Sequence, residues 1–196
     1  MTEGPEVSVL VHELGGMLSS VQGFAHIAEA NPDHPDRERF IKLAASEARR
    51  AAQALKDLHL ARSLDRGGIP ESPPPVEMAA LMSRVASESK HDGLVLAGAP
   101  DVSVRADPAK VAGLLARCIG VAVAPAEVRR SGSGVAIRVP VAPAQDLARK
   151  TEALEAPYPD MVLFTLTRRL VDRWGGGLTL AAEGDHSVVT IRLEGA

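Results

Sequence analysis

A chain of 196 residues with 45% hydrophobic residues can bury one moderate core or two small ones. The net charge of -3, with acidic and basic residues interspersed, gives no indication of nucleic acid as a partner. The single Cys118 excludes an internal disulfide, and no apolar run reaches the roughly 20 residues of a membrane-spanning helix. We therefore expect a cytoplasmic protein without a membrane segment.

The first predicted element is a helix over residues 5–30. Pro5 suits the first turn of a helix, and Glu6 places negative charge where the helix dipole favours it. Apolar residues then recur at alternating spacings of three and four, which is typical of a helix packed against other helices. These residues are Val7, Leu10, Leu14, Met17, Val21, Phe24 and Ala28. His12 is outside this apolar stripe, so we expect its imidazole to face solvent.

A second helix follows a short break at residues 31–35, where two prolines cannot continue a helical hydrogen-bond ladder. Asp36 is its predicted N-cap, and Gly67 suits a left-handed C-cap. Residues 1–68 are therefore predicted to form an antiparallel helical hairpin. Its apolar face is too broad for one neighbouring helix, which favours a four-helix bundle made by two chains, that is, a homodimer.

The segment 69–75 is rich in proline and is predicted to link two domains. In residues 76–196 the pattern alternates between short strands and helices, which predicts an α+β fold: a small α/β sandwich with helices on one face of a mixed sheet. The expected helices span 77–90, 108–123 and 161–174. The expected strands span 94–97, 102–105, 135–139, 178–181 and 188–193, and the last two form a hairpin.

The run that begins at His12 resembles the phosphoacceptor box of the dimerisation and histidine-phosphotransfer domain of bacterial sensor histidine kinases. The resemblance rests on His12-Glu13-Leu14 followed by Leu18, Ser20, Val21, Gly23 and Phe24. The family usually has Arg, a small hydroxyl residue and a helix-kinking Pro where this chain has Gly15, Gly16 and Met17. The resemblance implies that His12 carries phosphate on an imidazole nitrogen and that Glu13 orients or deprotonates the ring.

The chemistry of histidine is compatible with this role. An ordinary imidazole is largely neutral and nucleophilic at neutral pH, and exposure on a rigid helix allows an aspartyl phosphate to approach in line. Adjacent helix residues do not face each other, so Glu13 would act electrostatically or through the second ring nitrogen of His12. The alternative interpretation is a solvated histidine on a helix exterior with no chemical role.

The second domain resembles the ATP-binding domain of the same kinases. Asp107-Pro108, followed by apolar residues at 111, 114, 115 and 119, resembles the start of a helix in that domain. Residues 166–178 resemble its final helix and the strand that follows. The resemblance implies a related scaffold downstream of the hairpin.

The residues that would contact a nucleotide depart from the family pattern. Arg117 and Val121 replace the asparagines that help hold magnesium and phosphate. Residues 140–143, Pro-Val-Ala-Pro, replace an Asp-x-Gly-x-Gly loop, and Met161 and Leu163 replace a glycine pair. Magnesium needs hard oxygen ligands, which these side chains lack. We therefore expect no ATP binding, no autophosphorylation, and no cofactor or metal held by this chain itself.

Two functions remain open at this stage. In the first, the protein is a histidine phosphotransferase of a two-component phosphorelay, which exchanges phosphate between response-regulator receiver domains through His12, with magnesium supplied by the receiver. Known dimeric phosphorelay proteins with a degenerate ATP domain resemble this architecture. In the second, it is a catalytically inactive adaptor that binds a response regulator or a kinase. An active kinase with a divergent nucleotide pocket is a third alternative.

Overall fold

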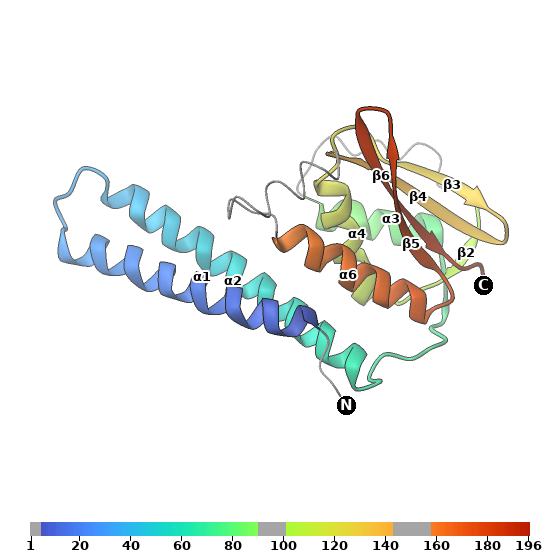
Figure 1. Cartoon of the computed structure of the whole chain (residues 1–196), viewed down its shortest axis with the longest axis horizontal. Helices are drawn as coiled ribbons and strands as arrows, with labels where there is room; N and C mark the ends of the chain where they lie inside the picture. Colours follow the sequence, from blue (N-terminus) through green and yellow to red (C-terminus); the bar gives the residue numbers. More distant parts are fainter. Residues whose placement is uncertain (1–4, 90–100, 143–157) are drawn as a thin grey trace. The chain divides into compact units, whose positions relative to one another are not determined.

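The computed structural model describes residues 5–89, 101–142 and 158–196. The chain divides into two compact units, Met1–Ile69 and Pro70–Ala196. The first unit is a helical hairpin and the second is an α+β domain (Figure 1). The strand expected at 94–97 lies outside the described residues.

The hairpin consists of α1, Pro5–Ala30, and α2, Arg37–Asp65, which run antiparallel (Figure 1). Both helices were predicted from the sequence. The turn between them is held by polar contacts: the His34 Nδ1 atom accepts a hydrogen bond from the Asp36 backbone N–H at 3.0 Å. Arg37 Nε donates to the Ala28 carbonyl at 3.2 Å and so ties the start of α2 to the end of α1. At the other end, Gly67 has φ 69° and ends α2 as expected.

The seam between α1 and α2 is built from aliphatic side chains of both helices, with alanine more frequent on α2. The buried residues are Val7, Leu10, Met17 and Ala28 of α1, with Ala51, Ala54, Leu58, Ala61 and Leu64 of α2. Near the turn, the rings of Phe24 and Phe40 stack with centroids 6.5 Å apart. Leu14 and Val21 belong to the predicted stripe but are only half-buried within a single chain.

Two sheets lie within the described part of the second unit. A two-stranded sheet pairs β1, Pro75–Glu77, with β2, Ser103–Arg105. A four-stranded sheet has the order β3-β4-β6-β5. Its strands are β3, Glu127–Ser131; β4, Gly134–Val141; β5, Gly177–Glu183; and β6, His186–Leu193.

A mixed sheet was expected, whereas all neighbouring strands in the described residues, which do not include the expected strand at 94–97, pair antiparallel. β4 and β5 point the same way and are connected through a helix, but β6 inserts between them. The C-terminal hairpin was predicted, whereas β1 and β3 were not. β1 begins at Pro75, and β3 carries Arg129 and Arg130 on an edge strand, so neither shows the usual apolar alternation.

Among the described residues, three helices accompany these sheets: α3, Met78–Glu88; α4, Pro108–Gly120; and α6, Tyr158–Arg173. α4 contacts α3 and α6, and α6 also contacts β5 and β6 (Figure 1). Between α4 and α6, Thr167 Oγ1 donates to the Leu163 carbonyl at 2.8 Å and lies 3.5 Å from the buried Cys118 Sγ. Cys118 is therefore a core residue of this unit.

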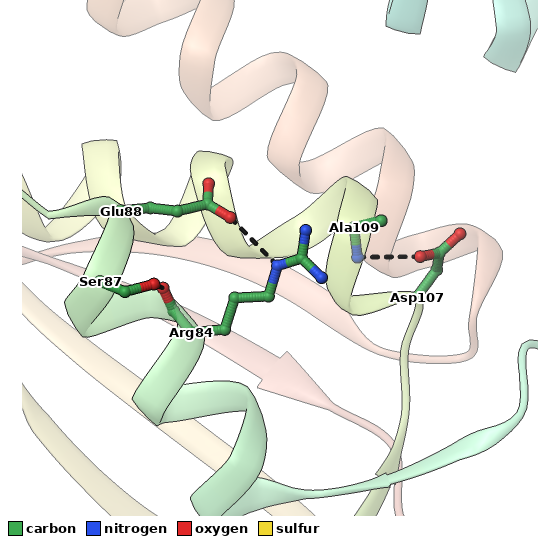
Figure 2. A network of polar contacts seen from close by, with 5 residues as sticks. All are labelled: Arg84, Ser87, Glu88, Asp107 and Ala109. Atoms are coloured by element: carbon green, nitrogen blue, oxygen red, sulfur yellow. Dashed lines mark hydrogen bonds and ion pairs between the residues drawn. The ribbon is translucent and has the colours of Figure 1, made fainter.

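The N-terminus of α4 is capped by Asp107, which accepts a hydrogen bond from the Ala109 N–H at 2.9 Å (Figure 2). At the end of α3, Arg84 Nε donates to Glu88 at 3.1 Å (Figure 2). The Glu88 carboxylate packs over α4, since a Cβ added to Gly113 would lie 2.9 Å from Glu88 Oε2. A glycine at this position thus leaves room for the Glu88 carboxylate.

The proline-rich segment is part of the second unit. Trp174 Nε1 donates to the Pro70 carbonyl at 3.0 Å, and an Arg105 nitrogen donates to Ser72 Oγ at 2.9 Å. Arg173 lies 3.6 Å from the Glu71 carboxylate, and Pro73 is buried. These contacts attach the segment to α6, to the residue after it and to β2.

The Asp107 cap generates a stability prediction. Replacing Asp107 with alanine should lower the free energy of unfolding of the second unit by about 1 kcal/mol, because an orphan N–H of α4 loses its acceptor. Asp107→Ser should retain most of the stability. Trp174 is the single tryptophan and is buried in this unit, so its fluorescence during urea denaturation reports the change.

The same cap predicts a pH dependence. Burial opposes ionisation of Asp107, but Lys110 and the backbone amides of Ala109 and Lys110 outweigh it and hold the pKa of Asp107 below its usual value. Because the folded pKa lies below the unfolded one, the stabilisation is present above the unfolded pKa of about 3.9 and is lost as pH falls through the folded pKa. The difference between wild type and Asp107→Ala should therefore shrink in acid. A constant difference would contradict this account.

Candidate functional site

His12 lies in the N-terminal half of α1 and is exposed, outside the buried stripe of the hairpin. Its exposure follows from helical periodicity, since Leu10 and Met17 on the opposite side are buried. A reactant can therefore reach either nitrogen of the ring from solvent without unfolding the helix.

On the C-terminal side of His12, the positions one turn along α1 carry no side chains. Gly15 and Gly16 lie three and four residues after His12, and a Cβ at either position would meet nothing within 4 Å. Gly23 further along the helix is equally open. Ser19 folds back and donates to the Gly15 carbonyl at 3.0 Å. Packing inside the chain does not require these glycines, although each costs about 1 kcal/mol relative to alanine in a helix interior. Their position leaves the backbone beside His12 accessible.

Glu13 differs from His12 in its surroundings because it is half-buried. Burial raises the pKa of the Glu13 carboxyl above its usual value, while the charges of Arg50 and protonated His12 partly counteract this rise. A carboxylate with a raised pKa accepts a proton more readily than a solvated one. Glu13 is thus suited to proton transfer next to the ring.

Arg50, whose charge acts on Glu13, is paired with Glu47 on α2. One Arg50 nitrogen donates to both Glu47 carboxylate oxygens, at 2.8 and 3.0 Å. The Glu47 side chain is 19% exposed and that of Arg50 is 51% exposed. Sequence reasoning missed this pair. The available signal was that Glu47 occupies a position of the α2 repeat where an apolar residue is expected, and a partly buried acid there needs a basic partner.

The positions expected to contact a nucleotide hold unsuitable groups in the second unit. Arg117 lies on α4, whereas Val121 follows the end of that helix at Gly120. Val141 is buried in β4 and Leu163 is buried in α6. A guanidinium and apolar side chains supply no oxygen ligand for magnesium, so these residues do not fit a magnesium-nucleotide complex. Among residues 5–89, 101–142 and 158–196, no group of three or more His, Cys, Asp or Glu is arranged to hold a metal ion.

None of the helices described in the structure is long and apolar enough to cross a membrane. No protein-family model matches the sequence, and no curated protein matches it either. The comparison with solved structures, in contrast, finds similar folds.

The chain is similar to the histidine kinase AdeS of Acinetobacter baumannii, with a TM-score of 0.63 and 15% sequence identity over 93% of this chain and 97% of AdeS. It is similar to full-length ShkA, solved in complex with AMPPNP, with a TM-score of 0.57 and 22% identity. That match covers 100% of this chain but 46% of ShkA, so the chain spans about half the length of ShkA. A bacterial phosphotransferase aligns with a TM-score of 0.46 and 14% identity over 97% of this chain and 98% of its own.

At these sequence identities, the first two similarities establish the fold and not the activity. They confirm the predicted order of a helical hairpin followed by an α+β domain, over nearly the whole of this chain. The protein therefore has a histidine-kinase-like fold.

Proposed function

We propose that the protein is a histidine phosphotransferase of a two-component phosphorelay. In this proposal His12 receives the phosphoryl group from the aspartyl phosphate of one receiver domain and passes it to the aspartate of a second. The observation that carries the proposal is an exposed histidine beside an open stretch of helix backbone, in a fold similar to that of histidine kinases.

The transfer step needs only groups that the two partners supply. The unprotonated ring nitrogen of His12 attacks phosphorus, and an N–P bond forms as the P–O bond to the receiver aspartate breaks, so that the carboxylate leaves. The remaining ring proton passes to Glu13, the adjacent residue. Magnesium, held by the receiver, neutralises the phosphoryl oxygens. Transfer to the second receiver is the reverse sequence.

Transfer through His12 is tested with a receiver domain that carries radioactive phosphate on its aspartate. We expect acid-labile phosphate to appear on the full chain and His12→Gln to abolish it, because the nucleophilic nitrogen is lost. His26→Gln is the matched control, since His26 is an equally exposed histidine two heptads further along α1. It should transfer normally.

The outcomes of this experiment separate the two functions. Labelling that persists in His12→Gln would contradict the assigned nucleophile. A receiver that binds the wild-type chain without any transfer would identify the protein as the adaptor.

The residues at the expected nucleotide contacts support a role without ATP. At about 1 mM magnesium-ATP, a site with a dissociation constant of about 10 μM would raise the free energy of unfolding of the second unit by about 2.7 kcal/mol. We expect no such stabilisation in urea denaturation followed by Trp174 fluorescence, with magnesium chloride alone as the control. A saturable increase with ATP would favour the kinase alternative.

We propose that the protein is a homodimer in which a second copy covers the exposed apolar side of the hairpin. Val11 and Leu18 of α1 are about half-exposed, and Ile41 and Leu55 of α2 are similarly exposed. Each pair is separated by a multiple of seven residues, so each forms a row along its helix. Because the helices are antiparallel, both rows flank the same side of the seam, next to the half-buried Leu14 and Val21. Two such faces would form a four-helix bundle.

The dimer is tested with Leu18→Lys, which places a charge in the apolar row without altering the buried seam. We expect the dissociation constant to rise by on the order of tenfold or more, because both copies lose a buried leucine. Ser19→Lys, one residue further on, is the control. Sedimentation equilibrium measures both. A monomeric wild-type chain, or a dimer that Leu18→Lys leaves unchanged, would contradict the bundle.

A further inference from the structure

The strand β5, Gly177–Glu183, lies at an edge of the four-stranded sheet. All seven of its residues pair with β6, and among the described residues no strand lies on its other side. An unpaired edge presents a row of backbone N–H and C=O groups to any other extended chain. β5 therefore has the geometry to accept one more strand.

The two edges of this sheet differ in how they are protected. Edge strands usually avoid pairing with other chains through charged residues, proline or a bulge. β3, the other edge strand in the described residues, carries the exposed Arg129 and Arg130. β5 has no proline and an unbroken register with β6, and its single charged residue is Glu183, which Arg138 binds at 2.5 and 2.7 Å. The β5 edge thus lacks the features that keep an edge strand unpaired.

Leu180, in the middle of β5, is exposed on the side where a further strand would lie. Its cross-strand neighbour Val189 is 1% exposed, so both side chains lie on the face of the sheet that forms the core. Leu180 is nevertheless 49% exposed. Leu178 and Ala182 share this face with it, because side chains alternate along a strand. A second apolar strand beside β5 would cover Leu180.

β5 is complementary to itself. Leu180 is the central residue of Gly177–Glu183, so an antiparallel copy of β5 centred on Leu180 pairs all seven residues. The two Leu180 side chains then lie opposite each other, and Leu178 lies opposite the second copy's Ala182. No two like charges are opposed. Such a contact is isologous, and it joins the two four-stranded sheets into one continuous antiparallel sheet.

The charges at the ends of the strand are complementary in this arrangement. Glu183 would lie opposite the second copy's Gly177, which pairs with the exposed Arg192 of β6. Two strand spacings are about 10 Å, a distance that an arginine and a glutamate side chain span together. Gly177 leaves this path open, since a Cβ there would meet only Asp172 Oδ1, at 3.8 Å, and Asp172 is paired with Arg168. Each end can thus hold an ion pair between copies.

We propose that β5 is an interaction surface for a second copy of this chain, which adds its own β5 antiparallel to the first with Leu180 at the centre. The inference is independent of phosphate transfer and of the proposed contact between hairpins. A chain with two self-complementary surfaces forms a dimer when both contacts share one axis and a larger assembly when they do not. The β5 surface is therefore tested where the hairpin contact is weakened.

The first test is sedimentation equilibrium of the full chain in the Leu18→Lys background. We expect this chain still to self-associate, and added Leu180→Lys to raise the dissociation constant by roughly tenfold or more, because two like charges then lie directly opposite each other. Val123→Lys is the matched control, since Val123 is another exposed apolar residue of the second unit. It should associate as the background does. Circular dichroism checks that each variant is folded.

The second test determines the register, by disulfide cross-linking in the same background. Thr179→Cys and Ala181→Cys are made in separate chains, one of which carries a size tag, and the native Cys118 is buried. The mixed chains should cross-link in higher yield than either alone, because residue 179 lies opposite residue 181 of the second copy. Two identical cysteines would be diagonal neighbours, roughly 7–8 Å apart, which is too far for an unstrained disulfide.

The failures are distinguishable from those of the proposed function. A Leu18→Lys chain that is monomeric overturns the inference and leaves the β5 edge for an extended segment of another protein. Association that Leu180→Lys leaves unchanged overturns it as well, and so does equal cross-linking in mixed and separate samples. None of these results alters the transfer of phosphate to His12, which is measured separately.

Discussion

The packing of α1 against α2 is the constraint on which the candidate site depends. Leu10 and Met17 of α1 are buried, as are Ala51, Ala54 and Ala61 of α2, and this seam leaves His12 on the outside. The same contact partly buries Glu13 and brings the charge of Arg50 close enough to act on it. Exposure of the nucleophile and desolvation of the neighbouring acid thus have one physical origin. Neither property requires a contact that is specific to His12.

The sequence predicted the hairpin well because its signals are local and strong. Pro32 and Pro35 cannot lie within a helix, and the apolar repeat determines which residues of α1 face α2. The exposure of His12 follows from that repeat alone. The contribution of α2 to the site could not be read in this way. Which α2 residue lies opposite Glu13 depends on the length of the turn and on the stacking of Phe24 with Phe40, and neither is expressed in a helical pattern.

The second unit was predicted less completely, for related reasons. The strands β4 and β6 have buried residues at alternate positions and were found, whereas β3 is a polar edge strand and β1 starts at Pro75. The order of the strands in the sheet could not be predicted from local sequence patterns either. A helix that connects two strands suggests parallel neighbours, and only the tertiary structure shows β6 between β4 and β5.

In the second unit, the residues that form the core can be compared with the positions that bind nucleotide in the family it resembles. Its core is continuous through α4, α6 and the sheet, with Leu115, Ile137, Leu166 and Ile191 fully buried. Nucleotide binding in the family that it resembles depends on a few asparagine and glycine positions, and here those positions hold residues such as Arg117 and the buried Leu163. The buried Leu163 adds apolar surface to the core, so a residue of this kind is compatible with the packing of the unit. The packing of the core therefore does not by itself decide whether a ligand site is present.

The open glycines of α1 have a mechanical consequence. An α-helix bends most easily where side chains do not brace successive turns, and Gly15 and Gly16 form such a place one turn beyond His12. The family that this segment resembles has a proline just after it, which weakens the same stretch of helix by removing a hydrogen bond. In this chain α1 remains helical through both glycines, so any weakening of the stretch comes from missing side-chain contacts and not from a lost backbone hydrogen bond.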